Sequence, residues 1–155
     1  MPTPVDHALL RSVARLRALG DERLAKIAAL ATKVEAPRGA VLFEEGEPAD
    51  EIYLIVDGRL ALTVAAGPGQ ETVLLTLGPG ELTGWSGLKP HGRVATARVQ
   101  RDSTLLRLPA DALLALCDED HEIGYAVFRA LFDELSHRLH DTRLQLLDMF
   151  GKRER

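Results

Sequence analysis

Between residues 40 and 108, short apolar runs alternate with turn residues in a way that restricts the possible folds. The runs are three to six residues long and rich in Val, Leu, Ile and Thr, and turns rich in Gly, Pro or Asp recur every eight to twelve positions. This spacing is typical of β-strands in a barrel or a rolled sheet. We predict about seven or eight short strands in a barrel or jelly-roll-like β-roll. The clearest are expected at 41–43, 52–56, 60–64, 72–77, 95–100 and 104–108.

Two turn signals set the expected connections between these strands. Asp57-Gly58 separates 52–56 from 60–64 and is a strong signal for a two-residue hairpin, because glycine accepts the positive φ that such turns need. Gly67-Pro68-Gly69 forms the next turn. We therefore expect a tight reversal of the chain at each place.

The two ends of the chain have helical rather than strand periodicity. Apolar residues predict a helix over 6–19, and Asp21 is a suitable N-cap for a second helix. After Pro109 the pattern predicts a short helix over 111–116 and a long one over 121–149. We expect a mainly β protein with flanking helices (α+β). Its centre is a double-stranded β-helix with an N-terminal helix pair and a long C-terminal dimerisation helix.

The length of 155 residues favours one domain with one core. We expect a single domain over 1–155, with a helical N-terminal part at 1–38 and a β-roll at 39–108. The C-terminal helices occupy 109–155, and Gly151 is expected to end the long helix.

Charge and composition exclude several classes of protein. The net charge of −4 and the pI near 5.7 give no broad basic surface for nucleic acid. The longest apolar run, 112–117, is too short to cross a bilayer, and the first residues show no signal-peptide pattern. Cys117 is the only cysteine, so an intrachain disulfide is impossible. We expect a cytoplasmic protein with no membrane contact.

A regular apolar seam runs along the expected C-terminal helix, with alternate spacings of four and three residues as in coiled coils. A helix of about 28 residues is about 42 Å long and extends beyond a small roll, so we expect the seam to form a parallel homodimer. Packing on the chain's own roll is the alternative. The polar Thr142 either sets the register or directs its hydroxyl at a ligand. The seam consists of Phe128, Phe132, Leu135, Leu139, Thr142, Leu146 and Met149.

The segment 80–88, Gly-Glu-Leu-Thr-Gly-Trp-Ser-Gly-Leu, has the layout of a phosphate-binding loop inside a β-barrel. Gly80 and Gly84 allow tight turns, nearby residues offer backbone N–H groups, and Arg93 follows as a cation. A ribose phosphate would need a carboxylate beside the second glycine, but Trp85 stands there. The pattern indicates a small-ligand sensor.

Taken together, these features resemble the cyclic-nucleotide-binding domain of the Crp/Fnr-type sensor proteins over nearly the whole chain. The resemblance implies a pocket between a β-roll and a long helix, and a helix that is repositioned by the ligand. It rests on Leu-Phe-Glu-Glu-Gly-Glu at 42–47 with Tyr-Leu-Ile at 53–55 and Gly58, on the loop at 80–97, and on Arg138-Leu139 with Thr142.

The resemblance also implies roles for the loop residues. In the family, the second loop glycine donates its N–H to the ligand, a glutamate binds the ribose, and an arginine followed by Ser or Thr binds the phosphate. Gly84 and Arg93 match this pattern, whereas Trp85 and Val94 do not. A hydrogen bond to a charged partner is worth roughly 1.5–3 kcal/mol, so we expect an anionic or nucleotide-like ligand other than cyclic AMP or GMP in the usual pose. The expected ligand-binding residues are Glu81, Gly84, Trp85, Ser86, Arg93, Val94 and Thr142.

Two interpretations of the tryptophan remain open. Trp85 either lines the site and stacks on a planar ligand, or fills the pocket as a core aromatic side chain. In the second case the chain is a ligand-free dimeric protein-interaction module with a degenerate pocket.

Other kinds of site are not expected. His137 and His140 share one helix face but have no third anchored ligand, so we predict no metal site. We find no acid–base pair of catalytic character, and we predict no catalytic residue, no enzyme activity and no cofactor beyond a possible nucleotide or other small anion. Family regulators carry a helix-turn-helix domain after the dimer helix. Because this chain ends at residue 155, we expect no direct DNA binding, but action through an unidentified downstream protein.

Overall fold

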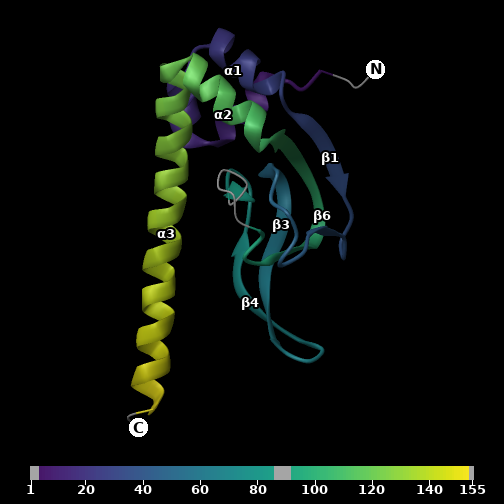
Figure 1. The fold of residues 1–155 in the computed structure, drawn as a ribbon, viewed down its shortest axis with the longest axis vertical. Helices are drawn as coiled ribbons and strands as arrows, with labels where there is room; N and C mark the ends of the chain where they lie inside the picture. Colours follow the sequence, from purple (N-terminus) through teal and green to yellow (C-terminus); the bar gives the residue numbers. More distant parts are fainter. Residues whose placement is uncertain (1–3, 86–91, 154–155) are drawn as a thin grey trace.

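The computed structural model describes residues 4–85 and 92–153 and centres on a six-stranded antiparallel sheet (Figure 1). The helices are η1 (His7–Ser12), η2 (Ala14–Ala18), α1 (Asp21–Ala28), α2 (Ala110–Glu119) and α3 (His121–Arg153). The strands are β1 (Thr32–Ala36), β2 (Val41–Phe43), β3 (Glu51–Gly67), β4 (Gln70–Leu77), β5 (Leu82–Thr83) and β6 (Thr96–Pro109). The shorter helices gather at one end of the sheet, while α3 runs along one side of the molecule.

Two long strands, β3 and β6, pair along nearly their whole length and hold the sheet together. The outer edge of β6 pairs with β1 at 103–107 and with β2 at 97–98, and the outer edge of β3 pairs with β5 at 53–54 and with β4 at 60–67. Register shifts between β3 and β6 separate the two sets of neighbours. The result is an open, rolled sheet, which confirms the predicted mainly β fold with flanking helices.

The predicted hairpin at Asp57-Gly58 is wrong. Both residues lie inside β3, where the register with β6 shifts. Gly58 has φ +112°, and a Cβ atom there would collide with the side chain of Ser103. The Ser103 hydroxyl also accepts the backbone N–H of Arg59 at 3.1 Å. Asp57 and Gly58 therefore form a β-bulge and not a hairpin turn, because β3 stays paired with β6 on both sides of them. β6 is likewise one strand where the sequence predicts two.

Side chains alternate between the two faces of β3 and β6 and so form two cores. Ile52 and Leu54 face the helices, whereas Tyr53 and Ile55 face the interior of the roll. The core beneath the helices encloses an apolar cavity of about 30 Å³. The interior core consists of Ala36, Phe43, Tyr53, Ile55, Leu60, Leu62, Leu77, Ala95, Ala97, Val99 and Leu105.

The predicted N-terminal helix pair is only half right. In place of one α-helix over 6–19, the chain forms the two 3-10 helices η1 and η2, joined at Val13. The physical reason lies in the spacing of the buried side chains, which is three residues, the period of a 3-10 helix. These buried side chains are Leu10, Val13, Leu16 and Leu19. In addition, β1 lies inside the segment 1–38 that the sequence pattern predicts as helical.

The C-terminal helices are longer than predicted. α2 has ten residues instead of six, and α3 continues through Gly151 to Arg153. At 1.5 Å per residue, the 33 residues of α3 span about 50 Å. The last buried residue of α3 is Leu131, so most of the helix contributes no buried side chain to the core. Within the described ranges, none of the helices has the length and apolar character of a membrane span.

Candidate functional site

The segment before the candidate loop is fixed to β3 by backbone hydrogen bonds. Gly80 donates its N–H to the Ile55 carbonyl at 2.8 Å, and Ile55 donates to the Glu81 carbonyl at 3.0 Å. The Glu81 carboxylate accepts the N–H of Gly78 at 2.7 Å, so this side chain stabilises the turn. β5 then pairs with β3 and brings Gly84 to the end of the roll. The start of the loop is therefore rigidly placed.

Arg93 lies inside this end of the roll and is only 4% exposed. Its Nη1 donates to the Gly84 carbonyl at 2.8 Å, and its Nη2 donates to the Glu51 carbonyl at 2.7 Å. The guanidinium carbon lies 4.1 Å from the centroid of the Phe43 ring. Nε is buried and has no hydrogen-bond partner among the described residues. Burial lowers the pKa of Arg93, because the charged form loses its hydration.

Gly84 permits this arrangement because it has no side chain. Its φ is +81°, in the left-handed region that favours glycine. A Cβ atom there would lie 2.7 Å from the Glu51 carbonyl oxygen and 2.8 Å from Arg93 Nη1. The predicted pairing of Gly84 with Arg93 in one site is thus a direct contact in the structure.

Trp85 follows Gly84 and is half-buried, packed against the core beneath the helices. The guanidinium carbon of Arg138, on α3, lies 5.6 Å from its ring centroid. Arg138 also donates from Nη2 to the Leu82 carbonyl and pairs with Glu134 at 3.6 Å. Through these contacts α3 is joined to the candidate loop.

Arg138 and Glu134 are partly desolvated at this contact. Burial lowers the pKa of Arg138, whose Nε has no partner among the described residues, and raises the pKa of the Glu134 carboxyl. The sequence predicts Arg138 as part of the family resemblance but not as one of the ligand-binding residues. The signal that could have found it is its spacing of seven and eleven residues from the buried Leu131 and Val127, which places it on the same helix face.

The other predicted ligand-binding residues are more scattered. Val94 is 68% exposed, whereas its neighbour Arg93 is buried. Thr142 is exposed, and its hydroxyl donates to the Arg138 carbonyl of its own helix at 2.8 Å. Ser86 lies outside the described residues. The structure therefore brings Gly84, Trp85 and Arg93 together, with Glu81 in the adjoining turn.

The predicted dimer seam forms a continuous surface stripe on α3. The first apolar seam residues come one position after a residue that packs on the rest of the chain, as Phe128 does after Val127. One residue corresponds to roughly 100° around the helix, so the seam and the packed face point in different directions. All the apolar seam residues are exposed in the single chain: Phe128, Phe132, Leu135, Leu139, Leu146 and Met149.

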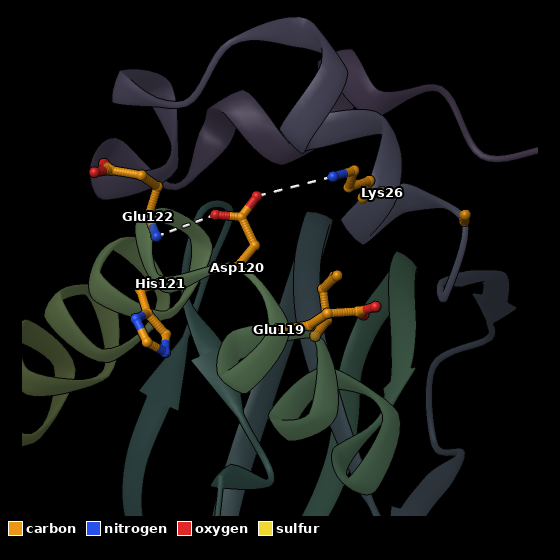
Figure 2. A pocket seen from close by; sticks show the side chains of 7 residues that line it. Lys26, Glu119, Asp120, His121 and Glu122 are labelled. Carbon is orange, nitrogen blue, oxygen red and sulfur yellow. Dashed lines mark hydrogen bonds and ion pairs between the residues drawn. The ribbon is translucent and has the colours of Figure 1, made fainter.

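A separate hollow lies between α1 and the junction of α2 with α3, and Figure 2 shows its side chains. Asp120 accepts the backbone N–H groups of Glu122 and Ile123 at 3.1 and 3.4 Å and so caps the start of α3. It also pairs with Arg23 at 3.0 Å and with Lys26 at 3.9 Å on α1. The charged residues of this hollow therefore have a structural role, because Asp120 caps α3 and also links it to α1 through ion pairs.

Comparison with known proteins identifies the family of this fold. Residues 33–120 match the family model described as cyclic nucleotide-binding domain. The chain is 38% identical over 120 residues to the cyclic AMP receptor protein of Thermus thermophilus, covering 77% of this chain and 55% of that protein. The matched region covers 61% of the CRP-like cAMP-activated global transcriptional regulator of Mycobacterium tuberculosis. The chain thus spans somewhat more than half the length of both relatives.

Two solved structures are similar over most of the chain. The N-terminal domain of a transcriptional regulator from Streptomyces coelicolor is 32% identical with a TM-score of 0.68, covering 89% of this chain and 94% of that one. A cyclic nucleotide-binding domain from Methylobacillus flagellatus has a TM-score of 0.84 at 18% identity, covering 96% and 88%, and supports the fold alone. The chain belongs to the cyclic nucleotide-binding domain family and is similar to its CRP-like regulators.

Proposed function

We propose that the chain is a non-catalytic regulatory sensor that binds a small anionic, nucleotide-like ligand at Arg93. The observation that carries this proposal is a guanidinium that is 4% exposed and forms no ion pair with a carboxylate among the described residues. A buried, unpaired charge is costly, so a fold that needed no anion would gain by replacing it. The names of the similar regulators, which refer to cyclic AMP, support a nucleotide-like ligand.

The ligand differs from cyclic AMP or cyclic GMP in the usual pose. Trp85 has only an indole N–H donor and cannot accept a hydrogen bond from a ribose hydroxyl as a carboxylate does. Val94 likewise offers no hydroxyl to a phosphate. A planar ligand can stack on the Trp85 ring while its anionic group accepts hydrogen bonds from the Arg93 guanidinium and the Gly84 N–H.

We infer that α3 reports ligand binding in a homodimer formed through its exposed seam. A ligand that enters beside Trp85 changes the contacts of Arg138 with the ring and with Leu82. Because Arg138 lies on α3, the helix must shift or repack when these contacts change. The signal then reaches a second copy and a downstream protein through the helix.

A panel of cyclic and linear nucleotides and inorganic phosphate, screened by thermal shift, tests the ligand site. A ligand that binds the folded state raises the Tm of the wild type. Arg93→Gln abolishes this rise, whereas Arg107→Gln, which removes a half-buried arginine paired with Glu51, preserves it. Arg93→Lys keeps the positive charge but lacks the planar guanidinium with its paired N–H donors. If this variant folds and does not bind, the loss of binding is distinguished from a loss of folding. A rise in Tm that is equal in Arg93→Gln and wild type contradicts the site.

A second candidate, the ligand-free dimeric module, is favoured by one observation. Both Nη donors of Arg93 are already used by backbone carbonyls, and Trp85 already packs on the core. This candidate predicts that no compound in the panel shifts the Tm and that Trp85 emission stays constant throughout.

A further inference from the structure

A groove of about 700 Å³ on the β-roll contains three arginine side chains. It is lined by Arg38, Gly39, Arg59, Val99, Gln100, Arg101 and Asp102. These residues come from the connection between β1 and β2 and from the bulged middle of β3 and β6. In Figure 1, β1 and β6 lie on the side of the roll away from α3. The groove is therefore separate from both the Arg93 site and the seam.

The backbone around the groove is firmly fixed. Gly39 donates to the Val99 carbonyl at 2.8 Å, and Val99 donates to the Ala40 carbonyl at 2.9 Å. Asp102 accepts the backbone N–H of Arg38 at 2.8 Å, which commits one of its oxygens and holds this arginine beside β6. The arginines thus project from a rigid scaffold.

The three arginines lack the carboxylate partner that six other arginines of the chain have. Arg11, Arg15, Arg23, Arg98, Arg107 and Arg138 each pair with a carboxylate. Among the residues that the structure describes, Arg38, Arg59 and Arg101 pair with none; Arg101 makes only a long contact, 3.5 Å, with the Gly58 carbonyl. In a chain of net charge −4, this grouping is a local concentration of positive charge.

Arg59 and Arg101 are also direct cross-strand partners. Like charges opposite each other on one sheet face destabilise the sheet, because their side chains project to the same side. An anion bound between the two guanidiniums removes this repulsion and gains charge-assisted hydrogen bonds.

The positive region is compact. Asp102 lines the groove itself, and a neighbouring hollow is lined by Glu35, Asp57 and the same Asp102. A nucleic acid needs a broad basic surface, and these carboxylates would repel its next phosphates. The groove therefore suits a small molecule that carries two or more adjacent charged groups.

We propose that this groove binds a compact polyanion with a diphosphate or triphosphate group, held by Arg38, Arg59 and Arg101. The site is independent of the proposed ligand at Arg93. It makes the chain responsive to a second small molecule, on the face of the roll opposite the dimer helix.

Calorimetric titration with inorganic tripolyphosphate, at low and at physiological salt, tests the site in the full chain. We expect about tenfold weaker binding for Arg59→Gln or Arg101→Gln and about a hundredfold for the double variant. Arg143→Gln, with the same charge change on an exposed arginine of α3, leaves the affinity unchanged. Equal losses in Arg143→Gln, or loss only in Arg93→Gln, overturn the proposal. Tighter binding of a glutamate-rich peptide or of single-stranded DNA also overturns it.

Stability provides a second, independent readout. Without polyanion, Arg101→Gln unfolds at a higher urea concentration than the wild type, because the repulsion with Arg59 is gone. With tripolyphosphate the order reverses, since only the wild type gains stability from binding. An unchanged or lower midpoint for Arg101→Gln without polyanion contradicts the inferred repulsion.

Discussion

Arg138 of α3 donates a hydrogen bond from Nη2 to the carbonyl oxygen of Leu82, which lies 56 residues earlier in the chain. The same guanidinium pairs with Glu134 and lies over the ring of Trp85. One side chain thus joins the long helix to the strand that leads into the candidate loop. A change at the loop cannot leave the environment of α3 unaltered.

Removal of this link is expected to loosen the helix from the loop. Arg138→Gln leaves the Leu82 carbonyl and the Glu134 carboxylate without their charged partner, which costs about 1–3 kcal/mol in the free energy of unfolding. Urea unfolding followed by Trp85 emission measures both the stability and the exposure of the ring. Arg129→Gln is the control, because it removes a half-buried α3 arginine that is hydrogen-bonded to Tyr125. Among the described residues, Arg129 has no hydrogen bond to Leu82 and no cation–π contact with Trp85, so this variant leaves both the stability and the ring exposure unchanged. Identical midpoints and spectra for Arg138→Gln and wild type contradict the link.

The Glu134 carboxyl gives a pH signature. Burial raises the pKa of Glu134 in the folded state above its ordinary value, despite the opposing effect of Arg138. The folded state therefore holds this proton more tightly than the unfolded state. Wild-type stability falls relative to Glu134→Gln as pH rises through the interval between the two pKa values. Urea midpoints measured from about pH 4 to about pH 7 should show the difference between variant and wild type growing in favour of Glu134→Gln. A difference that shrinks over this range contradicts the burial.

The Glu51 carbonyl and the Arg93 guanidinium lie so close to Gly84 that adding one methyl group there should strongly affect stability and binding. Gly84→Ala forces a side chain into positive φ and against both the Glu51 carbonyl and Arg93. We expect a loss of about 1–3 kcal/mol in unfolding free energy, together with loss of ligand binding. Gly151→Ala is the matched control, because a Cβ atom there meets nothing within 4 Å and alanine favours the helix. Thermal unfolding of the two variants should shift in opposite directions.

The seam predicts the oligomeric state. Leu139→Lys places a charge in the middle of the apolar stripe, so the dimer should dissociate into a monomer of 16.9 kDa. Leu147→Lys introduces the same charge at an exposed leucine on another face of the helix and retains the dimer. Light scattering after size-exclusion chromatography distinguishes the two species. A wild-type chain that is monomeric at micromolar concentration contradicts the dimer proposal.

The alternation of short apolar runs and turns was sufficient to predict the rolled sheet, because the strand period depends on local sequence. The pairing of the strands was not local. Asp57-Gly58 has the composition of a hairpin turn, but β6 supplies a partner on both sides of it, so β3 continues through a bulge. Only the tertiary partner distinguishes these two outcomes.

In the candidate site, too, some features could be predicted from local sequence and others depend on tertiary contacts. That Gly84 and Arg93 belong to one site was predicted from their order in the loop and the resemblance to the family, whereas their direct hydrogen bond was not. The burial of Arg93 was not predicted either, because Phe43 and the Glu51 carbonyl reach it from distant positions in the chain. Arg138 is not among the ligand-binding residues that the sequence predicts. A helix presents several faces, and the face that packs on the body is about 100° from the seam.

Nuclear magnetic resonance of the Arg93 Nε–H group tests the central claim most directly, because this donor is buried and has no partner among the described residues. The spectrum is recorded with and without each compound of the nucleotide and phosphate panel, and Arg93→Lys assigns the signal. We predict that an anionic ligand shifts this resonance and protects it from exchange with water, whereas cyclic AMP at similar concentration has a smaller effect. A resonance that no anion moves, or one that already exchanges rapidly with water, contradicts the anion site.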